Sequence, residues 1–354
     1  MKCIKGYIIW FLKCIVAGIV AIAILSVFSF FYYNHGIRRT SETGATDYSW
    51  ENRFHSVGYE GFAWGMNDSY GYNNAYILGE NQIDILLMGS SHMNAYNVPQ
   101  KCSVPYLLNR MIETSDAKYK GGVYNIGMEG HTFYICSDNL KDALETYSPQ
   151  KYVIMETRSV KLSMERMEEV LNGTRKRTPA FDSGLIYYMQ KVPYFCLLHR
   201  QIRDMCDLND ASLAENDNDT AEKTDNSNFD NTLENTTLDY NTQLNRYMEK
   251  LAKEVNSYNV KLLIFYMPSI SINDDGTVGT VGNVQDTAEF ASACRDYGIE
   301  FLDMSDVFLE DYRQNYELPF GFSNTEAGKG HLNRRGHELV ASALFDKIKE
   351  IEGK

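Results

Sequence analysis

The chain has 354 residues and a formal net charge of −13, and 44% of its residues are hydrophobic. Ten acidic residues and one lysine lie between Asp207 and Asp239; this stretch contributes −9 and leaves −4 for the rest of the chain. Without a basic field to hold phosphates, a nucleic-acid partner is excluded. The seven cysteines are scattered, so the sequence indicates neither a disulfide framework nor a metal site, and it predicts no cofactor.

An uncharged apolar run of 20 residues, Cys14–Tyr33, follows a short basic tail. About 20 apolar residues suffice to cross a ~30 Å hydrocarbon core. Because a short basic tail usually stays in the cytoplasm, we expect residues 1–13 to be a cytoplasmic tail and residues 14–33 a transmembrane signal anchor. The remaining residues would then lie on the outer side of the cell membrane, and the chain would be a single-pass membrane protein. A cleavable signal peptide and a buried core helix are the alternatives.

The chain beyond this run reads as an α/β domain. Residues 34–82 show weak periodicity and are interpreted as an approach segment packed on the domain. Short, nearly continuous apolar runs predict buried parallel strands. These runs are Ile83–Met88, Gly122–Ile126, Tyr152–Met155, Val260–Tyr266 and Ile299–Leu302. Helical patterns lie between them, as at Leu140–Tyr147 and in a last helix over Arg335–Ile351, so we expect a parallel sheet covered on both faces.

Two insertions interrupt this domain, which we place at residues 83–354. Residues 161–206 are helical in pattern. Residues 207–239 hold seven asparagines, ten acids and few apolar residues. Such a composition buries too little apolar surface to offset the entropy of ordering, so we predict a disordered acidic loop.

A serine and a histidine far apart in the sequence carry the chemical signal. Ser91 follows the first predicted strand in Asp84-Ile-Leu-Leu-Met-Gly-Ser-Ser-His92, and His331 lies before the last predicted helix in Gly330-His-Leu-Asn-Arg-Arg-Gly-His337. A serine hydroxyl is a poor nucleophile until a base takes its proton, and ligands of an open parallel sheet sit beyond the carboxyl ends of its strands. We therefore predict that His331 activates Ser91, with Ser90 as a helix cap.

These residues resemble the SGNH/GDSL hydrolase superfamily, which implies a flavodoxin-like three-layer α/β/α sandwich. The resemblance places the nucleophile at Ser91 in Gly89-Ser-Ser91 and the base at His331 in His331-Leu-Asn-Arg-Arg-Gly336. The block Tyr124-Asn-Ile-Gly-Met-Glu-Gly130 places the oxyanion-hole glycine at Gly130, beside the amide of Ser91. With one anchor, the chain is also similar to membrane-tethered members that acylate cell-envelope polymers, namely the alginate O-acetylation and D-alanyl-lipoteichoic acid transfer proteins.

The sequence departs from the family pattern at two places. The family's aspartate three residues before the histidine is replaced by Gly328, so Glu326 is taken as the tentative acid. Asn324, Asp303 and a backbone carbonyl remain alternatives. The family's asparagine after the third strand is also missing; Arg158 would serve there as an oxyanion donor or hold an anionic substrate. We further expect His92 and Asn333 to contribute to substrate binding.

The resemblance implies acyl transfer through an acyl-serine, and three functions follow from it. The first is an O-acyltransferase that acts on a cell-envelope glycan, with a multi-span membrane acyl carrier protein as its partner. The second is an esterase or deacetylase in which water is the acceptor. The third is a glycan-binding domain without catalysis, since the pattern of catalytic residues is incomplete.

Overall fold

The computed structural model describes most of the chain, and structural statements below concern its described part. The described residues are 2–34, 39–40, 46–47, 54–68, 70–75, 83–115, 122–175, 192–195, 197–198, 200–202, 233–273 and 275–353.

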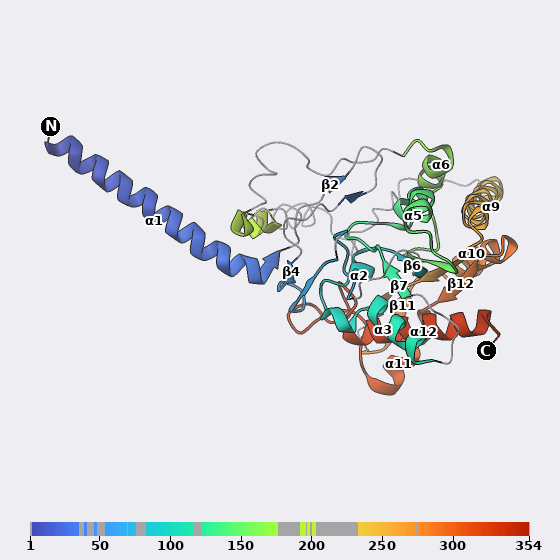
Figure 1. Cartoon of the computed structure of the whole chain (residues 1–354). Helices are drawn as coiled ribbons and strands as arrows, with labels where there is room; N and C mark the ends of the chain where they lie inside the picture. Colours follow the sequence, from blue (N-terminus) through green and yellow to red (C-terminus); the bar gives the residue numbers. More distant parts are fainter. Residues whose placement is uncertain are drawn as a thin grey trace.

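The first element is a long helix, α1 (Lys2–Tyr32), that projects away from the rest of the molecule (Figure 1). Its segment Gly6–Tyr32 is long and apolar enough to cross a membrane, and its side chains are almost wholly exposed. A helix satisfies its own backbone hydrogen bonds, which a lipid environment requires. The residues predicted as a tail, 1–13, are helical from Lys2 onward, and Tyr33, the last residue of the predicted anchor, belongs to a strand.

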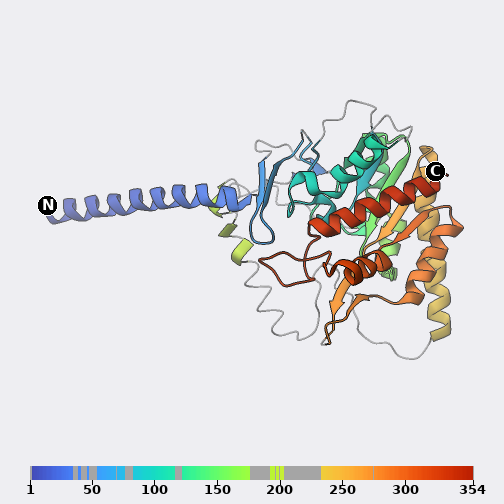
Figure 2. The ribbon, with the colours of Figure 1, turned by 90° about the horizontal axis from the view of Figure 1, so that it is seen from below.

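A small antiparallel sheet joins α1 to the domain. Its strand order is β1-β4-β5, with β1 at Tyr33–Asn34, β4 at Phe54–Val57 and β5 at Ala63–Met66. Figure 2 shows the β4–β5 hairpin lying across the end of α1, between this helix and the α/β body. The predicted approach segment therefore contains an ordered hairpin. A further two-residue pair, β2 (Arg39–Thr40) and β3 (Thr46–Asp47), lies in the same stretch of chain.

The domain is built on a five-stranded parallel sheet of order β12-β9-β8-β6-β7. The strands are β6 (Ile83–Met88), β7 (Gly122–Asn125), β8 (Tyr152–Thr157), β9 (Lys261–Tyr266) and β12 (Glu300–Asp303). Counted along the chain, this is the flavodoxin-like order 2-1-3-4-5. The predicted fold class is confirmed, and each predicted strand is present to within two residues at either end.

Helices cover both faces of the sheet. Alternate residues of β6 serve the two cores: Ile85 and Leu87 face α3, α11 and α12, whereas Leu86 and Met88 face α4, α5, α6, α9 and α10. Because both faces are buried, the strands read as continuous apolar runs in the sequence. The helices are α3 (Val104–Thr114), α4 (Phe133–Asp138), α5 (Leu140–Tyr147), α6 (Met164–Asn172), α9 (Leu233–Ser257), α10 (Val284–Asp296), α11 (Ser305–Asn315) and α12 (Arg334–Ile351).

The two predicted insertions are described only in part. Helix α6 opens the first, while residues 176–191 lie outside the described part of the chain. Residues 207–232 of the predicted disordered loop lie outside it as well. The last residues of that loop, 233–239, form the first turns of α9, so the helix begins earlier than its apolar pattern indicated. A hairpin of β10 (Ser269–Ile272) and β11 (Val278–Val281) was not predicted.

Candidate active site

The chain turns sharply after β6 and places Ser91 at the first residue of a short helix, α2 (Ser91–Asn94). Ser90 caps this helix, because its hydroxyl oxygen accepts a hydrogen bond from the His92 amide at 3.3 Å. Gly89 has no room for a side chain, since a Cβ there would lie 2.5 Å from both Glu156 Oε2 and Met93 Cγ. The glycine therefore lets the turn approach the neighbouring strand closely.

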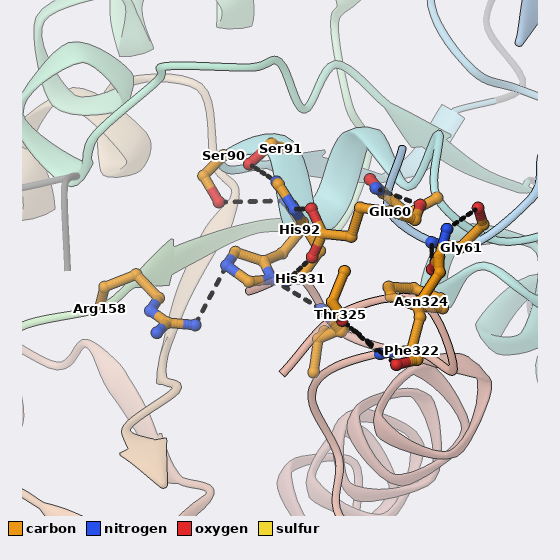
Figure 3. A network of polar contacts seen from close by, with 12 residues as sticks. Glu60, Gly61, Ser90, Ser91, His92, Arg158, Phe322, Asn324, Thr325 and His331 are labelled. Carbon is orange, nitrogen blue, oxygen red and sulfur yellow. Dashed lines mark hydrogen bonds and ion pairs between the residues drawn. The ribbon is translucent and has the colours of Figure 1, made fainter. Parts of the chain in front are cut away.

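Ser91 and His331 meet at this turn although they are 240 residues apart in the sequence. The distance from Ser91 Oγ to His331 Nε2 is 2.7 Å, within the range needed for a base to take the hydroxyl proton (Figure 3). The histidine lies in the segment that precedes α12, and Gly321 N donates to the His331 carbonyl at 3.0 Å. The two residues that the sequence paired are thus in hydrogen-bond contact.

Glu60 holds the other side of the His331 ring. The distance from His331 Nδ1 to Glu60 Oε2 is 2.5 Å, and the His331 amide donates to Glu60 Oε1 at 2.5 Å. A carboxylate only accepts, so Nδ1 carries the proton and Nε2 is left to accept from Ser91. Ser91, His331 and Glu60 therefore form one continuous hydrogen-bonded triad, with the acid contributed by the loop between β4 and β5.

The Glu60 carboxyl is buried, with 8% of the residue exposed. Burial raises its pKa, but the hydrogen bonds and the charge of His331 outweigh burial and leave the pKa of Glu60 below its ordinary value. Its contribution to folding stability is therefore present above the ordinary glutamate pKa and is lost as the pH falls through the lowered one. The acid remains ionised at neutral pH and can stabilise a protonated His331.

The carboxylate predicted for this role, Glu326, lies elsewhere. Its side chain is largely exposed and forms an ion pair of 2.8 Å with Lys329. The Asp303 carboxylate accepts from the amide and the hydroxyl of Ser305, the first residue of α11, at 2.8 and 2.6 Å. Nearness to the histidine in sequence was the wrong guide, since Glu60 is 271 residues away.

Asn324, another of the predicted alternatives, hydrogen-bonds the loop that carries Glu60 and not His331 itself. Its Oδ1 accepts from Gly61 N at 2.8 Å, and its Nδ2 donates to Gly58 O and Gly61 O at 3.0 and 3.2 Å. Gly61 has a φ of +70°, which glycine adopts without strain. Asn97 Nδ2 adds a hydrogen bond of 3.0 Å to the Glu60 carbonyl. These contacts fix the loop that presents the Glu60 carboxylate.

A second buried carboxylate, Glu156 at the end of β8, supports the nucleophile turn. Its Oε2 accepts from Ser90 N at 2.8 Å, and both oxygens lie 2.9 Å from the Ser90 hydroxyl. Burial raises the pKa of Glu156, and the hydrogen bonds from Ser90 and the charge of Arg158 offset this only in part. Glu156 is a positioning residue, because its contacts reach Ser91 through Ser90.

Replacing Glu156 with glutamine should slow the reaction of Ser91 with a fluorophosphonate about tenfold. The amide cannot accept at both positions, and hydrogen bonds to charged groups contribute about 1.5–3 kcal/mol. The rate constant of labelling measures the effect, with Glu165→Gln, an exposed glutamate of α6, as the matched control. Equal rates in the two variants would show that Glu156 does not position the nucleophile.

The predicted oxyanion glycine, Gly130, lies in a turn after β7 with a φ of +77°. This turn is tied to the nucleophile turn, because Met128 N donates to Gly89 O at 2.9 Å. An added Cβ at Gly130 would meet nothing within 4 Å, so the glycine borders open space. Strands β6, β7 and β8 end at one edge of the sheet, and β6 and β8 flank the point where the strand order reverses, the usual ligand site of such folds.

Arg158 follows β8 and reaches His92, next to the nucleophile. Arg158 Nη1 lies 3.1 Å from His92 Nε2, Nη2 donates to Ser269 Oγ at 2.8 Å, and the guanidinium lies 5.1 Å from the centre of the Phe320 ring. The His92 and His331 ring centres are 5.1 Å apart. A cationic donor therefore stands one ring away from the His331 imidazole, at the position after the third strand that the sequence singled out.

The two ring nitrogens of His92 both face N–H groups. Leu332 N donates to Nδ1 at 3.1 Å, while Arg158 approaches Nε2. Burial and the charge of Arg158 hold the pKa of His92 well below its ordinary value, so the ring is neutral and accepts only once. The neutral His92 ring therefore lies between the Leu332 amide and the Arg158 guanidinium.

Asn333 caps α12 and ties down the segment before it. Its side-chain oxygen accepts from Gly336 N at 3.0 Å, and its Nδ2 donates to Leu318 O at 2.7 Å. Both ends of the amide are thus engaged within the fold, and its role in substrate binding stays a prediction. His337 is buried, and its Nδ1 accepts from Val104 N at 3.3 Å; burial lowers the pKa of His337 to about 3.

A hollow of about 690 Å³ near the site is lined by Phe62, Phe320, Phe322, Arg334 and Arg335 among others, but not by Ser91 or His331. We place the reacting centre by the contact between Ser91 and His331, because proton transfer requires hydrogen-bond distance and not a large cavity.

No protein-family model matches the sequence. No curated protein matches it either. Similar solved structures include esterase EstA from Pseudoalteromonas sp., with 15% identity, a TM-score of 0.38, and coverage of 76% of this chain and 98% of that one. The acetyl xylan esterase AlAXEase has 11% identity, a TM-score of 0.39, and coverage of 75% and 100%. TesA has 12% identity, a TM-score of 0.38, and coverage of 75% and 98%. Likeness this distant says nothing about activity, so the chemistry rests on the geometry of the site.

Proposed function

We propose that this chain is a serine-dependent acyl-transfer enzyme of the SGNH type, with Ser91 as nucleophile, His331 as base and Glu60 as the orienting acid. The observation that supports this most directly is the unbroken chain of contacts, 2.7 Å from Ser91 Oγ to His331 Nε2 and 2.5 Å from His331 Nδ1 to Glu60 Oε2. A nucleophile, a base and a group that orients the base are the parts that covalent catalysis by serine needs. A glycan-binding domain without catalysis would not need this alignment.

The reaction runs in two proton-balanced halves. His331 takes the Ser91 proton as the oxygen attacks an ester carbonyl, and the amides of Ser91 and Gly130 stabilise the resulting oxyanion, with Arg158 as a further donor. The tetrahedral intermediate collapses to an acyl-serine, and protonated His331 gives its proton to the departing alkoxide. An acceptor hydroxyl then loses its proton to His331 and attacks the acyl-serine. As this second tetrahedral intermediate collapses, His331 gives the proton to the departing Ser91 Oγ, which restores the free serine.

The acceptor in our proposal is a hydroxyl group of a cell-envelope glycan. The apolar helix α1 supports this location, since it is long enough to cross a membrane, and the lysines near its start favour an N-terminus in the cytoplasm. The α/β domain would then work outside the cell membrane and receive acyl groups from a multi-span membrane carrier protein. Water as acceptor, which makes the chain an esterase or deacetylase, is the second candidate and shares every residue of the site.

The test begins with the full chain in detergent micelles and a fluorophosphonate probe, which labels only activated serines. We expect stoichiometric labelling, and an unlabelled wild-type protein would overturn the proposal. Turnover of a chromogenic acetyl ester is then measured with and without acetyl-free oligosaccharides. Faster release with a saccharide, together with acetylated saccharide as product, supports transfer, whereas release that no saccharide accelerates assigns the chain to the esterases.

Arg158→Ala should lower kcat for the chromogenic ester by about 10²–10³-fold, the cost of removing one oxyanion donor. Arg158→Lys should recover part of this loss, because it keeps the charge but not the forked geometry. Turnover is measured with Arg313→Ala, an exposed arginine of α11, as the control. If Arg158→Ala matches that control, Arg158 takes no part in stabilising the transition state.

A further inference from the structure

The last turn of α1 is seated on one face of the small sheet. The Ser56 hydroxyl donates to the Phe30 carbonyl at 2.8 Å, and the rings of Phe30 and Phe54 are stacked with centres 4.8 Å apart. Gly58 lies against the same helix end, where a Cβ would come within 2.7 Å of the Tyr32 ring. The end of the apolar helix and the β4–β5 hairpin are therefore fixed to each other.

The same face of the sheet carries large exposed apolar side chains. In the antiparallel register Phe54 pairs with Met66 and Ser56 with Trp64, so these four side chains share one face. Trp64 is 58% exposed and Met66 is 55% exposed. Phe62, which is 61% exposed, packs edge-on against Trp64 with ring centres 5.6 Å apart. We call Phe54, Phe62, Trp64 and Met66 the anchor face.

The opposite face of the sheet is turned toward the α/β body. His55, Val57 and Ala63 alternate with the anchor-face residues and are each at most 4% exposed. The His55 ring stacks on Tyr96 of the α/β body with centres 4.0 Å apart. The apolar side chains that remain outside the core are thus those on the side from which α1 departs.

We propose that the anchor face rests in the interfacial layer of the lipid bilayer that α1 crosses. The hairpin lies across the end of α1, so a bilayer around α1 would have its surface at this sheet (Figure 2). Tryptophan and other aromatic residues favour the headgroup level of a membrane, where an apolar ring meets water. A lipid surface accounts both for the exposure of these side chains and for their position around the helix end.

Contact between the anchor face and the bilayer would place Glu60, the proposed acid, near the membrane surface. The significance of this position for catalysis rests on the proposed function. Glu60 lies in the loop that joins β4 and β5, so the anchor face, the acid and His331 form one connected unit. The chain's substrates would then be esters and hydroxyls presented at the bilayer surface, such as those of membrane-attached polymers.

Quenching of tryptophan fluorescence by brominated lipid tests the proposal. The full chain carries three tryptophans, Trp10, Trp50 and Trp64. The variant Trp10→Phe, Trp50→Phe keeps Trp64 alone and is reconstituted in phosphatidylcholine vesicles brominated near the headgroup end of one acyl chain. We expect Trp64 emission to fall roughly twofold relative to unbrominated vesicles, as for a ring at the interface.

A matched control carries its only tryptophan on the far side of the domain. Tyr258→Trp, in a background where the three native tryptophans are phenylalanine, lies just after α9, which is remote from α1 in both views (Figures 1 and 2). It should not be quenched. A variant that keeps only Trp10 reports insertion of α1 and should also be quenched by bromines near the headgroups, because Trp10 lies near the other end of the apolar segment Gly6–Tyr32. The proposal is overturned if Trp64 emission is quenched no more than that of the control. The same result, and the same conclusion, would follow if a second copy of the chain covered the anchor face.

Fluorophosphonate labelling in the same vesicles separates this proposal from the proposed function. If Ser91 is labelled but Trp64 is not quenched, the proposed enzymatic function stands and the proposed contact of the anchor face with the membrane is wrong. If Trp64 is quenched but Ser91 is not labelled, the membrane contact stands and the proposed enzymatic function is wrong.

Discussion

Replacing Ser91 with alanine should abolish fluorophosphonate labelling and lower turnover of an activated ester by about 10⁶-fold, the loss seen when a catalytic serine is removed. The reason is geometric, since no other hydroxyl in the described part of the chain is hydrogen-bonded to the ring of His331. The oxyanion donors and the binding surface would remain and sustain a residual rate above that in water.

Ser90→Ala is the matched control for this prediction. Ser90 is the adjacent serine, but its hydroxyl bonds to Glu156 and caps α2. Its loss should cost about 1 kcal/mol of stability and slow labelling without abolishing it. Intact protein mass after labelling reads out both variants. If Ser90→Ala loses the label and Ser91→Ala keeps it, the nucleophile has been assigned to the wrong serine.

The sequence predicted the sheet well because of how a parallel sheet is buried. Strand β6 has apolar neighbours on both faces, so its residues form an unbroken apolar run that stands out in a hydrophilic chain. The contact between Ser91 and His331 was predicted for a related reason, since Ser91 follows the turn after a strand and His331 lies shortly before a helix. Chemistry positioned by regular elements leaves a local signal.

The acid left no such signal. Glu60 lies in a loop between two four-residue strands of a segment with weak periodicity, and its burial depends on contacts from residues near the other end of the chain. Among 47 acidic residues, nothing in the letters marks one whose carboxylate is folded inward. Glu326 was chosen for its nearness to His331, but its surface ion pair with Lys329 shows that chain proximity does not set side-chain direction.

The sequence also predicted the apolar helix at the start of the chain, but with boundaries that differ from those of α1. Hydropathy locates the apolar core of a membrane segment, but helical hydrogen bonding continues through the lysines before it, so α1 begins at Lys2. At its other end the helix stops because Tyr33 and Asn34 pair with β4. One consequence bears on the proposed function: α1 runs directly into the sheet whose loop carries Glu60.

Glu60→Gln should therefore lower kcat by about 10⁴-fold, the cost of losing the group that fixes the tautomer of a catalytic histidine. Glutamine has one acceptor oxygen where glutamate has two, and Glu60 accepts from both the ring and the amide of His331. The amide NH₂ would face one of these donors and favour the imidazole tautomer that cannot accept the Ser91 proton.

The measurement is kcat for the chromogenic ester across neutral pH, alongside thermal unfolding to confirm that the variant is folded. Glu326→Gln is the control, and we expect it to leave turnover unchanged because its carboxylate pairs with Lys329 at the surface. Glu60→Asp, which keeps the charge on a shorter side chain, should retain more activity than Glu60→Gln. A wild-type rate in Glu60→Gln, or a large loss in Glu326→Gln, would remove Glu60 from the triad and return the sequence-based assignment of Glu326 to consideration.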